Sequence, residues 1–156
     1  MKIRYEIDLP SELPIPTSSD LTVRTVAPSD LDGLAGLMLD AYRGTIDYED
    51  ETFEDAITEV QSFLDAKPSL AHSYLAVDGD EVASAVLVSV YEGEPFIGYV
   101  MTRPRHKNQR LGRHLVRLAM ASLADEGHTR IALYITDGNT PSEWLFAGVG
   151  ARPVDP

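Results

Sequence analysis

A short basic turn between a predicted strand and a predicted helix limits most strongly what this chain can fold into. Residues 96–102 are rich in β-branched and aromatic side chains and predict a strand. Apolar side chains at helical spacing then predict a helix over about residues 110–127, and residues 130–136 predict a further strand. A strand, a helix and a strand in this order indicate a mixed α/β architecture.

The remaining segments also show either the alternation of a strand or the apolar spacing of a helix. Asp78-Gly79-Asp80 lies between two β-branched runs, which is typical of a hairpin turn. The order of elements is therefore β-α-α-β-β-β-α-β-α, an α/β fold. The predicted strands cover residues 21–27, 73–77, 82–91, 96–102 and 130–136, and the predicted helices begin near residues 30, 52, 110 and 140.

Side chains able to cap a helix precede three of the predicted helices. Ser29 and Asp32 have the spacing of a capping box, as do Thr52 and Asp55. Thr140 is followed by a proline, which is favoured in the first helical turn. We therefore expect Ser29, Thr52 and Thr140 to cap their helices.

The length and the proline distribution suggest one domain with a short N-terminal extension. A chain of 156 residues is of single-domain size. Residues 9–20 are rich in Pro and Ser and predict a linker, so we interpret residues 1–20 as an arm and residues 21–156 as the domain. Within the arm, Lys2–Asp8 alternates weakly and predicts a short edge strand.

Composition excludes several classes of protein. The chain has no Cys, which rules out disulfides, zinc–thiolate sites and a Cys nucleophile, and we expect no metal. A net charge of −12 argues against nucleic acid and anionic membranes as partners. The longest apolar stretch, Val82–Val90, is about half of the ~20 residues that span a bilayer. With no signal-peptide pattern at its start, the chain is expected in the cytoplasm.

The charge is distributed unevenly along the chain. No acid occurs from Pro95 to Ala124, and the rest of the chain carries a net −18. This basic segment holds six cationic side chains: Arg103, Arg105, Lys107, Arg110, Arg113 and Arg117. Because a helix N-terminus presents unpaired N–H groups, cations at the same turn predict a site for phosphate groups. The phosphate-binding patterns GxxxxGK[ST] and GxGxxG are both absent from the sequence.

Two motifs at the expected separation resemble the GCN5-related N-acetyltransferase (GNAT) family. The first, TRPRHKNQRLGR from Thr102, resembles the family pattern V-x-P-x-x-[RQ]-G-x-G-x-G/A. The second, DGNTPSEWLFAGVG from Asp137, resembles N-x-x-A-x-x-L-[YF]-x-x-x-G-F. The resemblance extends from about Leu21 to Val154. It implies a central mixed sheet flanked by helices.

The resemblance implies direct transfer of an acetyl group from acetyl-CoA, as cosubstrate, to a primary amine of a small molecule or a protein. The residues that it implies for binding CoA are Met101, Thr102, Arg103, Lys107, Asn108, Gln109, Arg110, Leu111, Gly112, Arg113, Asn139 and Phe146. Backbone N–H groups near Met101–Arg103 would hold the pantetheine. Asn139 could equally serve only to end the turn before the Thr140 helix.

The sequence departs from the family pattern at three places. Arg110 stands where the family usually has Gly, and its side chain either crowds the pyrophosphate or binds it. Phe146 stands where the family often has a Tyr that protonates the departing thiolate, and Phe has no proton to give. The last strand of the family is short or missing here, and Lys2–Asp8 is a candidate to fill its place.

Candidates for catalysis and acceptor binding follow from these departures. Glu94 has the strand parity of Phe96 and Thr102 and is the candidate base, with a solvated turn acid as the alternative. Tyr134 and Ser142 are candidate acids in place of the missing Tyr. The resemblance implies that the junction of the first two helices helps to shape the acceptor site, where Asp40, Tyr42 and Asp47 are candidates. These acids attract a cationic amine or simply form a solvated helix face.

A second function remains open beside acetyl transfer. The departures at Arg110 and Phe146 fit a catalytically weak acyl-CoA-binding or regulatory domain on the same fold. Nucleic-acid binding through Arg103–Arg117 is disfavoured by the net charge and by the lack of aromatic residues among these cations. The protein is expected to be a monomer or a homodimer.

Overall fold

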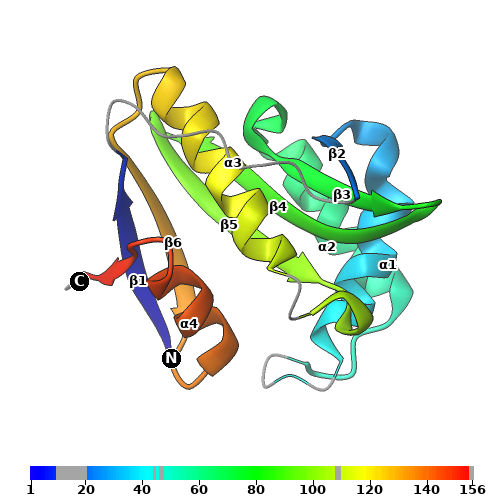
Figure 1. Ribbon diagram of the computed structural model, residues 1–156. Helices are drawn as coiled ribbons and strands as arrows, with labels where there is room; N and C mark the ends of the chain where they lie inside the picture. Colours follow the sequence, from blue (N-terminus) through cyan, green and yellow to red (C-terminus); the bar gives the residue numbers. More distant parts are fainter. Residues whose placement is uncertain (10–20, 44, 46–47, 108–109, 155–156) are drawn as a thin grey trace.

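The computed structural model describes residues 1–9, 21–43, 45, 48–107 and 110–154 (Figure 1). Over these ranges the strands are β1 (Lys2–Asp8), β2 (Thr22–Thr25), β3 (Tyr74–Asp78), β4 (Glu81–Tyr91), β5 (Glu94–Thr102), β6 (Arg130–Thr136) and β7 (Arg152–Pro153). The α-helices are α1 (Leu31–Tyr42), α2 (Phe53–Asp65), α3 (Leu111–Asp125) and α4 (Thr140–Ala147). Short 3₁₀ helices are η1 (Pro28–Asp30), η2 (Leu70–His72) and η3 (Pro104–His106). The expected order of elements is present, with β1 before it and β7 after it.

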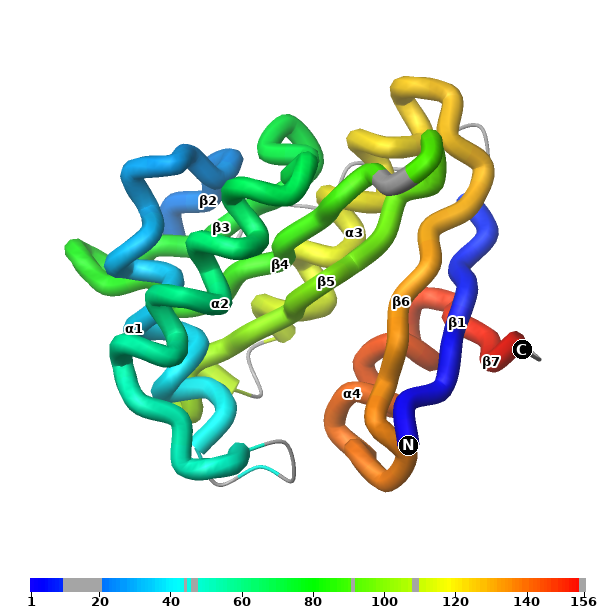
Figure 2. The backbone as a smooth tube through the Cα atoms, turned by 180° about the vertical axis from the view of Figure 1, so that it is seen from behind, coloured from blue at the N-terminus to red at the C-terminus, as the bar shows by residue number. Residues whose placement is uncertain are grey.

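The described strands form one seven-stranded mixed sheet in the order β2-β3-β4-β5-β6-β1-β7. Neighbouring strands are antiparallel except β5 and β6, which are parallel because α3 crosses over between them. Helices α3 and α4 cover one face, and α1 and α2 cover the other face over β3, β4 and β5 (Figures 1 and 2). The predicted α/β fold with a central mixed sheet is confirmed.

Strand β1 lies inside the sheet, between β6 and β7. It pairs with β6 over its whole length, from Lys2 opposite Thr136 to Asp8 opposite Arg130. The pairing of β1 with β7 involves only Tyr5 and Glu6 on the β1 side. The predicted strand is therefore present, but it is not the outermost one. It occupies the place beside β6 that the short C-terminal strand leaves open.

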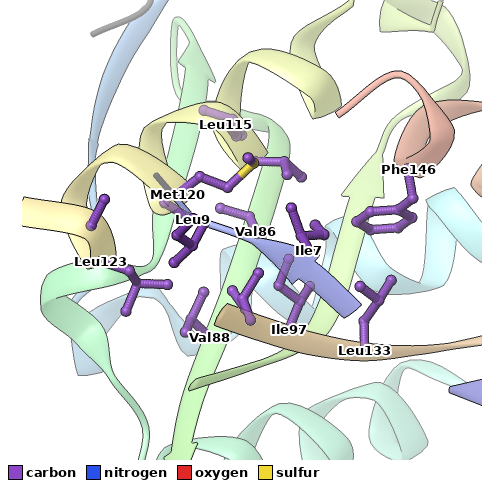
Figure 3. Packing of buried hydrophobic residues seen from close by; sticks show 14 of the residues in the cluster. Ile7, Leu9, Val86, Val88, Ile97, Leu115, Met120, Leu123, Leu133 and Phe146 are labelled. Atoms are coloured by element: carbon purple, nitrogen blue, oxygen red, sulfur yellow. The ribbon is translucent and has the colours of Figure 1, made fainter. Parts of the chain in front are cut away.

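The N-terminal strand also contributes to the core beneath α3. Ile7 is 1% exposed and packs with Leu133 of β6 and Phe146 of α4 (Figure 3). Leu9 lies in the same cluster, and its N–H donates to the carbonyl of Thr129 at 2.8 Å. Since core side chains of this size stabilise by several kcal/mol, the first residues of the chain are part of the hydrophobic core.

A β-bulge at Gly98 changes the side-chain alternation along β5. Leu87 of β4 is opposite Tyr99, whereas the next residue, Val88, is opposite Ile97, so Gly98 has no partner of its own on β4. Ile97 packs on the α3 side, and Tyr99 packs on the α1 and α2 side. The uniform parity expected for residues 94–102 is therefore wrong. Phe96 and Thr102 point to opposite faces of the sheet.

Helix capping follows the sequence prediction only for α2. Thr52 Oγ1 accepts from the N–H of Asp55 at 3.2 Å, and Asp55 accepts from the N–H of Thr52 at 2.9 Å. Ser29 lies within η1, and the side chain that organises this start is Asp30. The cap of α4 is Asn139, because Thr140 is already the first helical residue.

Asp30 anchors the start of α1 to strand β2. Its carboxylate accepts from the N–H of Ala27 at 2.8 Å and from two nitrogens of Arg24 at 2.7 and 2.9 Å. The Arg24 guanidinium lowers the pKa of Asp30 below its ordinary value, and the Ala27 N–H acts in the same direction against the effect of burial. The carboxylate form is thus favoured by folding.

Replacing Asp30 tests this link between charge and stability. Because the folded-state pKa is lowered, the stabilisation is complete above 3.8, the ordinary value, and is lost as the pH falls through the folded-state pKa. We expect Asp30→Asn to lower the free energy of unfolding by about 1–3 kcal/mol at neutral pH. In urea titrations this difference from wild type should shrink in acid. Asp32→Asn, at an exposed residue in the first turn of α1, is the control, with an expected loss of about 0.5 kcal/mol. Equal losses for both variants would contradict the role of Asp30.

Replacing Ile7 tests whether β1 is integral to the fold. Ile7→Ala should lower the free energy of unfolding by about 2–5 kcal/mol, because it leaves a cavity under α3. Lys2→Ala, at an exposed residue of the same strand, should change it by less than about 0.5 kcal/mol. A loss for Ile7→Ala as small as that for Lys2→Ala would show that the strand contributes little to stability.

No helix among the described residues is both long and apolar enough to cross a membrane.

Candidate functional site

Strands β5 and β6 pair over only a short length and then separate. Their parallel pairing joins Phe96 with Ala132 and Ile97 with Leu133. Beyond this point β5 remains paired with β4 as far as Thr102, and β6 remains paired with β1 as far as Thr136. Figure 2 shows the two strands diverging from there. The sheet is thus divided in the middle, with main-chain edges of β5 and β6 on the two sides of the division.

Hydrogen-bond alternation identifies the residues of β5 that face this division. The N–H of Arg103 donates to the carbonyl of Ala83 at 2.9 Å, and the pairing continues from there in register. In an antiparallel pair, alternate residues bond to the same neighbour. The main-chain groups of Met101 and Arg103 therefore face β4, whereas those of Val100 and Thr102 face the side of β6. The backbone of Met101–Arg103 was expected to hold a ligand, and within this segment only the main-chain groups of Thr102 face the division. The main-chain groups of Val100 face it as well, although the sequence did not indicate Val100.

The N-terminus of α3 is held close to this part of β5. Gly112 lies in the first turn, and a Cβ on it would be 3.1 Å from Leu145 Cδ1. The same Cβ would be 3.4 Å from Thr102 Oγ1 and from Val100 Cγ1. A glycine therefore suits the close approach of this helix start to α4 and to β5. Leu111, just before it, is buried, so its side chain serves packing.

Arg110 precedes α3 in a left-handed backbone conformation, with φ 59° and ψ 25°. This conformation is unfavourable by about 1–2 kcal/mol for an L-residue with a side chain. It explains physically why glycine suits this position in the family pattern. The exposed Arg110 side chain brings a cation to the start of the helix, where unpaired N–H groups also face outward.

Two of the six cations of the basic segment are engaged elsewhere. Arg103 is 13% exposed and donates to Asp40 Oδ2 at 3.1 Å and to the carbonyl of Val82 at 2.8 Å. Its Nε also lies 3.1 Å from Glu81 Oε1, and Arg105 forms an ion pair with the same carboxylate. Arg103 and Asp40, expected at the CoA and acceptor sites respectively, are thus bound to each other. They fasten the end of β5 to α1 and β4.

Lys107 and Arg110 differ from these two arginines. Both are exposed, and neither forms an ion pair with any residue that the structure describes. Arg113 lies against the end of α4, since a Cβ on Gly148 would be only 2.5 Å from its Nη2. The site therefore retains Lys107 and Arg110 as available cations beside the first turn of α3. Asn108 and Gln109 lie outside the described residues.

Helix α4 places Asn139 and Phe146 in structural roles. Asn139 Oδ1 accepts from the N–H of Ser142 at 3.4 Å and caps the helix. Phe146 is 5% exposed and belongs to the core, where it packs near Ile7 and Leu133 (Figure 3). Ser142 is half-buried in the first turn. The contacts of Asn139 and Phe146 with a CoA molecule remain predictions.

The candidate base Glu94 is held in an ion-pair network. Its carboxylate accepts from Arg4 at 2.7 Å and lies 3.6 Å from Arg130 Nε. Because of the bulge, Glu94 points to the opposite face from Val100 and Thr102. Tyr134 is 50% exposed, bonds to Arg4, and packs against Phe96 with ring centroids 5.5 Å apart. Glu94 and Tyr134 thus share Arg4 as a neighbour and lie on the same face.

Tyr99 and Glu59 form a further pair on this face, which the sequence analysis did not identify. The hydroxyl of Tyr99 donates to the Glu59 carboxylate of α2. Burial raises the pKa of Tyr99, and the bond to Glu59 raises it further, so the phenol keeps its proton. Tyr42 lies close enough to contribute to the same shift, whereas Asp47 is outside the described residues. Gly98 lies within a predicted strand, where a glycine often marks a bulge. It is the feature of the sequence that could have revealed the change in side-chain alternation along β5.

Comparison with known proteins relates this geometry to a family. The family model for the Acetyltransferase (GNAT) family matches residues 36–150. No curated protein matches the chain. A GCN5-related N-acetyltransferase from Sphaerobacter thermophilus has a TM-score of 0.77 at 20% identity, covering 98% of this chain and 48% of that one. The present chain therefore spans about half the length of that relative.

Two other solved structures also resemble this chain in fold. PaiA N-acetyltransferase from Thermoplasma acidophilum, in complex with coenzyme A, has a TM-score of 0.67 at 16% identity, covering 85% of this chain and 89% of that one. An aminoglycoside 6'-N-acetyltransferase from Acinetobacter haemolyticus has a TM-score of 0.67 at 14% identity, with coverages of 87% and 94%. At these identities the likeness establishes the fold. Together with the family match over most of its length, it shows that the chain belongs to the GNAT acetyltransferase family.

Proposed function

We propose that the protein is an acetyl-CoA-dependent N-acetyltransferase that transfers acetyl directly from the thioester to a primary amine. The observation that carries the proposal is the division between β5 and β6, beside which α3 begins. The main-chain groups of Val100 and Thr102 face this division, and two cations without an ion-pair partner among the described residues lie at the helix start. A ligand with an extended chain of amides and a phosphate end is complementary to this arrangement, because its amides can bond to the strand edge and its phosphates can bind at the helix start.

The residues at this place fit the two ends of CoA. The N–H groups of the first turn of α3, with Lys107 and Arg110, would bind the pyrophosphate. Gly112 supports the fit, since it lets the helix start lie against β5. Val100 and Thr102 would bond to the pantetheine amides as an additional strand does. When bound, acetyl-CoA supplies the activated acetyl group.

The transfer needs a deprotonated amine and a proton for the leaving thiolate. The chain has no Cys, which supports direct attack over an acyl-Cys route. Glu94 would take the proton only by weakening its bond to Arg4, so a water chain that carries the proton to solvent is the simpler path. Tyr134, on the same face, and Ser142, at the start of α4, are the candidate acids in place of Phe146.

The acceptor would approach from the α1 and α2 face, since α3 and its cations lie on the other. Nine acids and one base lie between Asp40 and Asp65, which supports a cationic amine. Asp40 takes part only weakly in this attraction, because Arg103 neutralises it. Tyr42 and the pair of Tyr99 with Glu59 would present polar groups to the amine.

An acyl-CoA-binding or regulatory domain is the second candidate. Its support is that Phe146 is buried in the core and that Glu94 is engaged by two arginines. Thermal-shift measurements with acetyl-CoA, CoA and ATP, followed by release of CoA thiol with a panel of amines, distinguish the cases. Stabilisation by CoA without amine-dependent thiol release would favour the binding domain, and no stabilisation by either CoA species would contradict both.

Charge reversal at the helix start tests the proposed phosphate site. Lys107→Glu with Arg110→Glu should weaken CoA binding at least about 100-fold, since each charge-assisted bond contributes about 1.5 kcal/mol or more. Isothermal titration calorimetry measures the dissociation constant. Arg117→Glu is the matched control, because it reverses an exposed charge further along the same helix. If the control weakened binding as much as the double variant, general charge rather than the helix start would explain the result.

Replacing Arg110 by glycine separates backbone strain from binding. Arg110→Gly relieves the left-handed conformation and should raise the free energy of unfolding by about 1 kcal/mol. The same change removes a cation and should weaken CoA binding about tenfold. Chemical denaturation should therefore show a more stable protein, whereas calorimetry should show weaker CoA binding. Tighter CoA binding by the glycine variant would instead indicate that the Arg110 side chain crowds the phosphates.

A further inference from the structure

A second polar cluster lies at the far end of α3 from the proposed CoA site. It forms where η2 packs against the last turns of the helix. His72, the last residue of η2, is 4% exposed and contacts Ser122 of α3 and Glu126, the C-cap residue of that helix. Ser122 and Glu126 are four residues apart and so lie on one face of the helix. The proposed acetyl transfer makes no use of these residues.

Both nitrogens of the His72 ring have a partner. Nε2 lies 2.7 Å from Glu126 Oε2, and Nδ1 is hydrogen-bonded to Ser122 Oγ. Because a carboxylate only accepts, Nε2 of the neutral ring must carry the proton and donate it to Glu126. Nδ1 is then an acceptor, and the hydroxyl of Ser122 donates to it. The other acceptor near this hydroxyl, the carbonyl of Ala71, is farther away at 3.5 Å.

The side chains of His72, Ser122 and Glu126 differ in their exposure to solvent. His72 is shielded from water, the side chain of Glu126 is 56% exposed, and Ser122 is only partly covered. His128 lies edge-on to His72 with ring centroids 6.5 Å apart, and its Nε2 is 3.9 Å from Glu126 Oε2. A hydroxyl that solvent reaches is thus bonded to a buried base, and an acid orients that base. This is the relationship of nucleophile, base and orienting acid in covalent catalysis.

We propose that Ser122 is a nucleophilic serine, with His72 as its base and Glu126 as a positioning residue, that accepts acyl groups from activated esters and thioesters. Ser122 Oγ forms a bond to the acyl carbon while its proton passes to His72 Nδ1. The bond from the acyl carbon to the leaving oxygen or sulfur then breaks, and His72 returns the proton to the leaving group. The product is an O-acyl serine, and no oxidant or metal is needed.

The position of Ser122 within α3 sets the expected extent of the reaction. The N–H groups around it are inside the helix and bond to carbonyls four residues earlier, so they do not stabilise an oxyanion. We therefore expect a single acylation of the serine rather than rapid turnover. The inference does not rest on the proposed acetyl transfer, because a reagent ester replaces acetyl-CoA as the donor.

The test is acetylation by p-nitrophenyl acetate, followed by intact-mass measurement and peptide mapping. Ser122 should be acetylated at least about tenfold faster than Ser62, an exposed helical serine on α2. Ser122→Ala should remove the modification from this peptide, and Ser62→Ala should leave it unchanged. Equal rates at Ser122 and Ser62 in the wild-type protein would overturn the proposal.

Variants of the two partners separate activation from packing. His72→Gln should slow acetylation of Ser122 about 100-fold. Glu126→Ala changes a largely exposed side chain, and Glu126→Gln, which keeps an accepting oxygen, should retain more of the rate than the alanine variant. Long-range ¹H–¹⁵N NMR should show the proton of His72 on Nε2 in the wild type and a mixture of tautomers in Glu126→Ala. Unchanged rates in Glu126→Ala and His72→Gln would show that the cluster is only a packing contact. CoA binding should be the same in all these variants.

Discussion

The early end of the pairing between β5 and β6 is the constraint on which the rest of the candidate site depends. Two neighbouring strands that pair at only two positions leave main-chain donors and acceptors facing each other across a divided sheet. Such groups are costly when they are buried without partners. The start of α3, with Lys107 and Arg110, lies beside this division, so one ligand could bind both the helix start and the open strand edges. On a continuous sheet those main-chain groups would be paired with each other and would not be available to a ligand.

Local patterns explain why much of the fold was predictable. Helix α2 carries a reciprocal cap between Thr52 and Asp55, and the hairpin between β3 and β4 has its glycine in the turn. These features depend on residues close in sequence, so the sequence alone shows them. The first turn of α3 and its basic residues were predictable for the same reason. The position of Gly112 in the motif agrees with its close packing against α4 and β5.

The parts that were not predictable depend on distant contacts. The bulge at Gly98 reverses the side-chain alternation and moves Glu94 away from the face expected for it. Arg103 belongs to the basic segment in sequence, yet in space it is bound to Asp40 and Glu81. Charge counted along a chain thus overstates the charge that a ligand would meet. Only the placement of acids from α1 and β4 shows which cations remain available.

The position of β1 has a consequence for how the molecule folds. Its partners are residues 130–136 and 152–153, so the half of the sheet beyond β5 joins the two extremes of the sequence. Residues 130–136 must leave the ribosome before this half can close. Closing so long a loop costs conformational entropy, and this cost arises before the stabilising contacts between the two segments have formed. We therefore expect β2 to β5 with α1 and α2 to be ordered first, and the slow step to be the pairing of β1 with the distant strand β6.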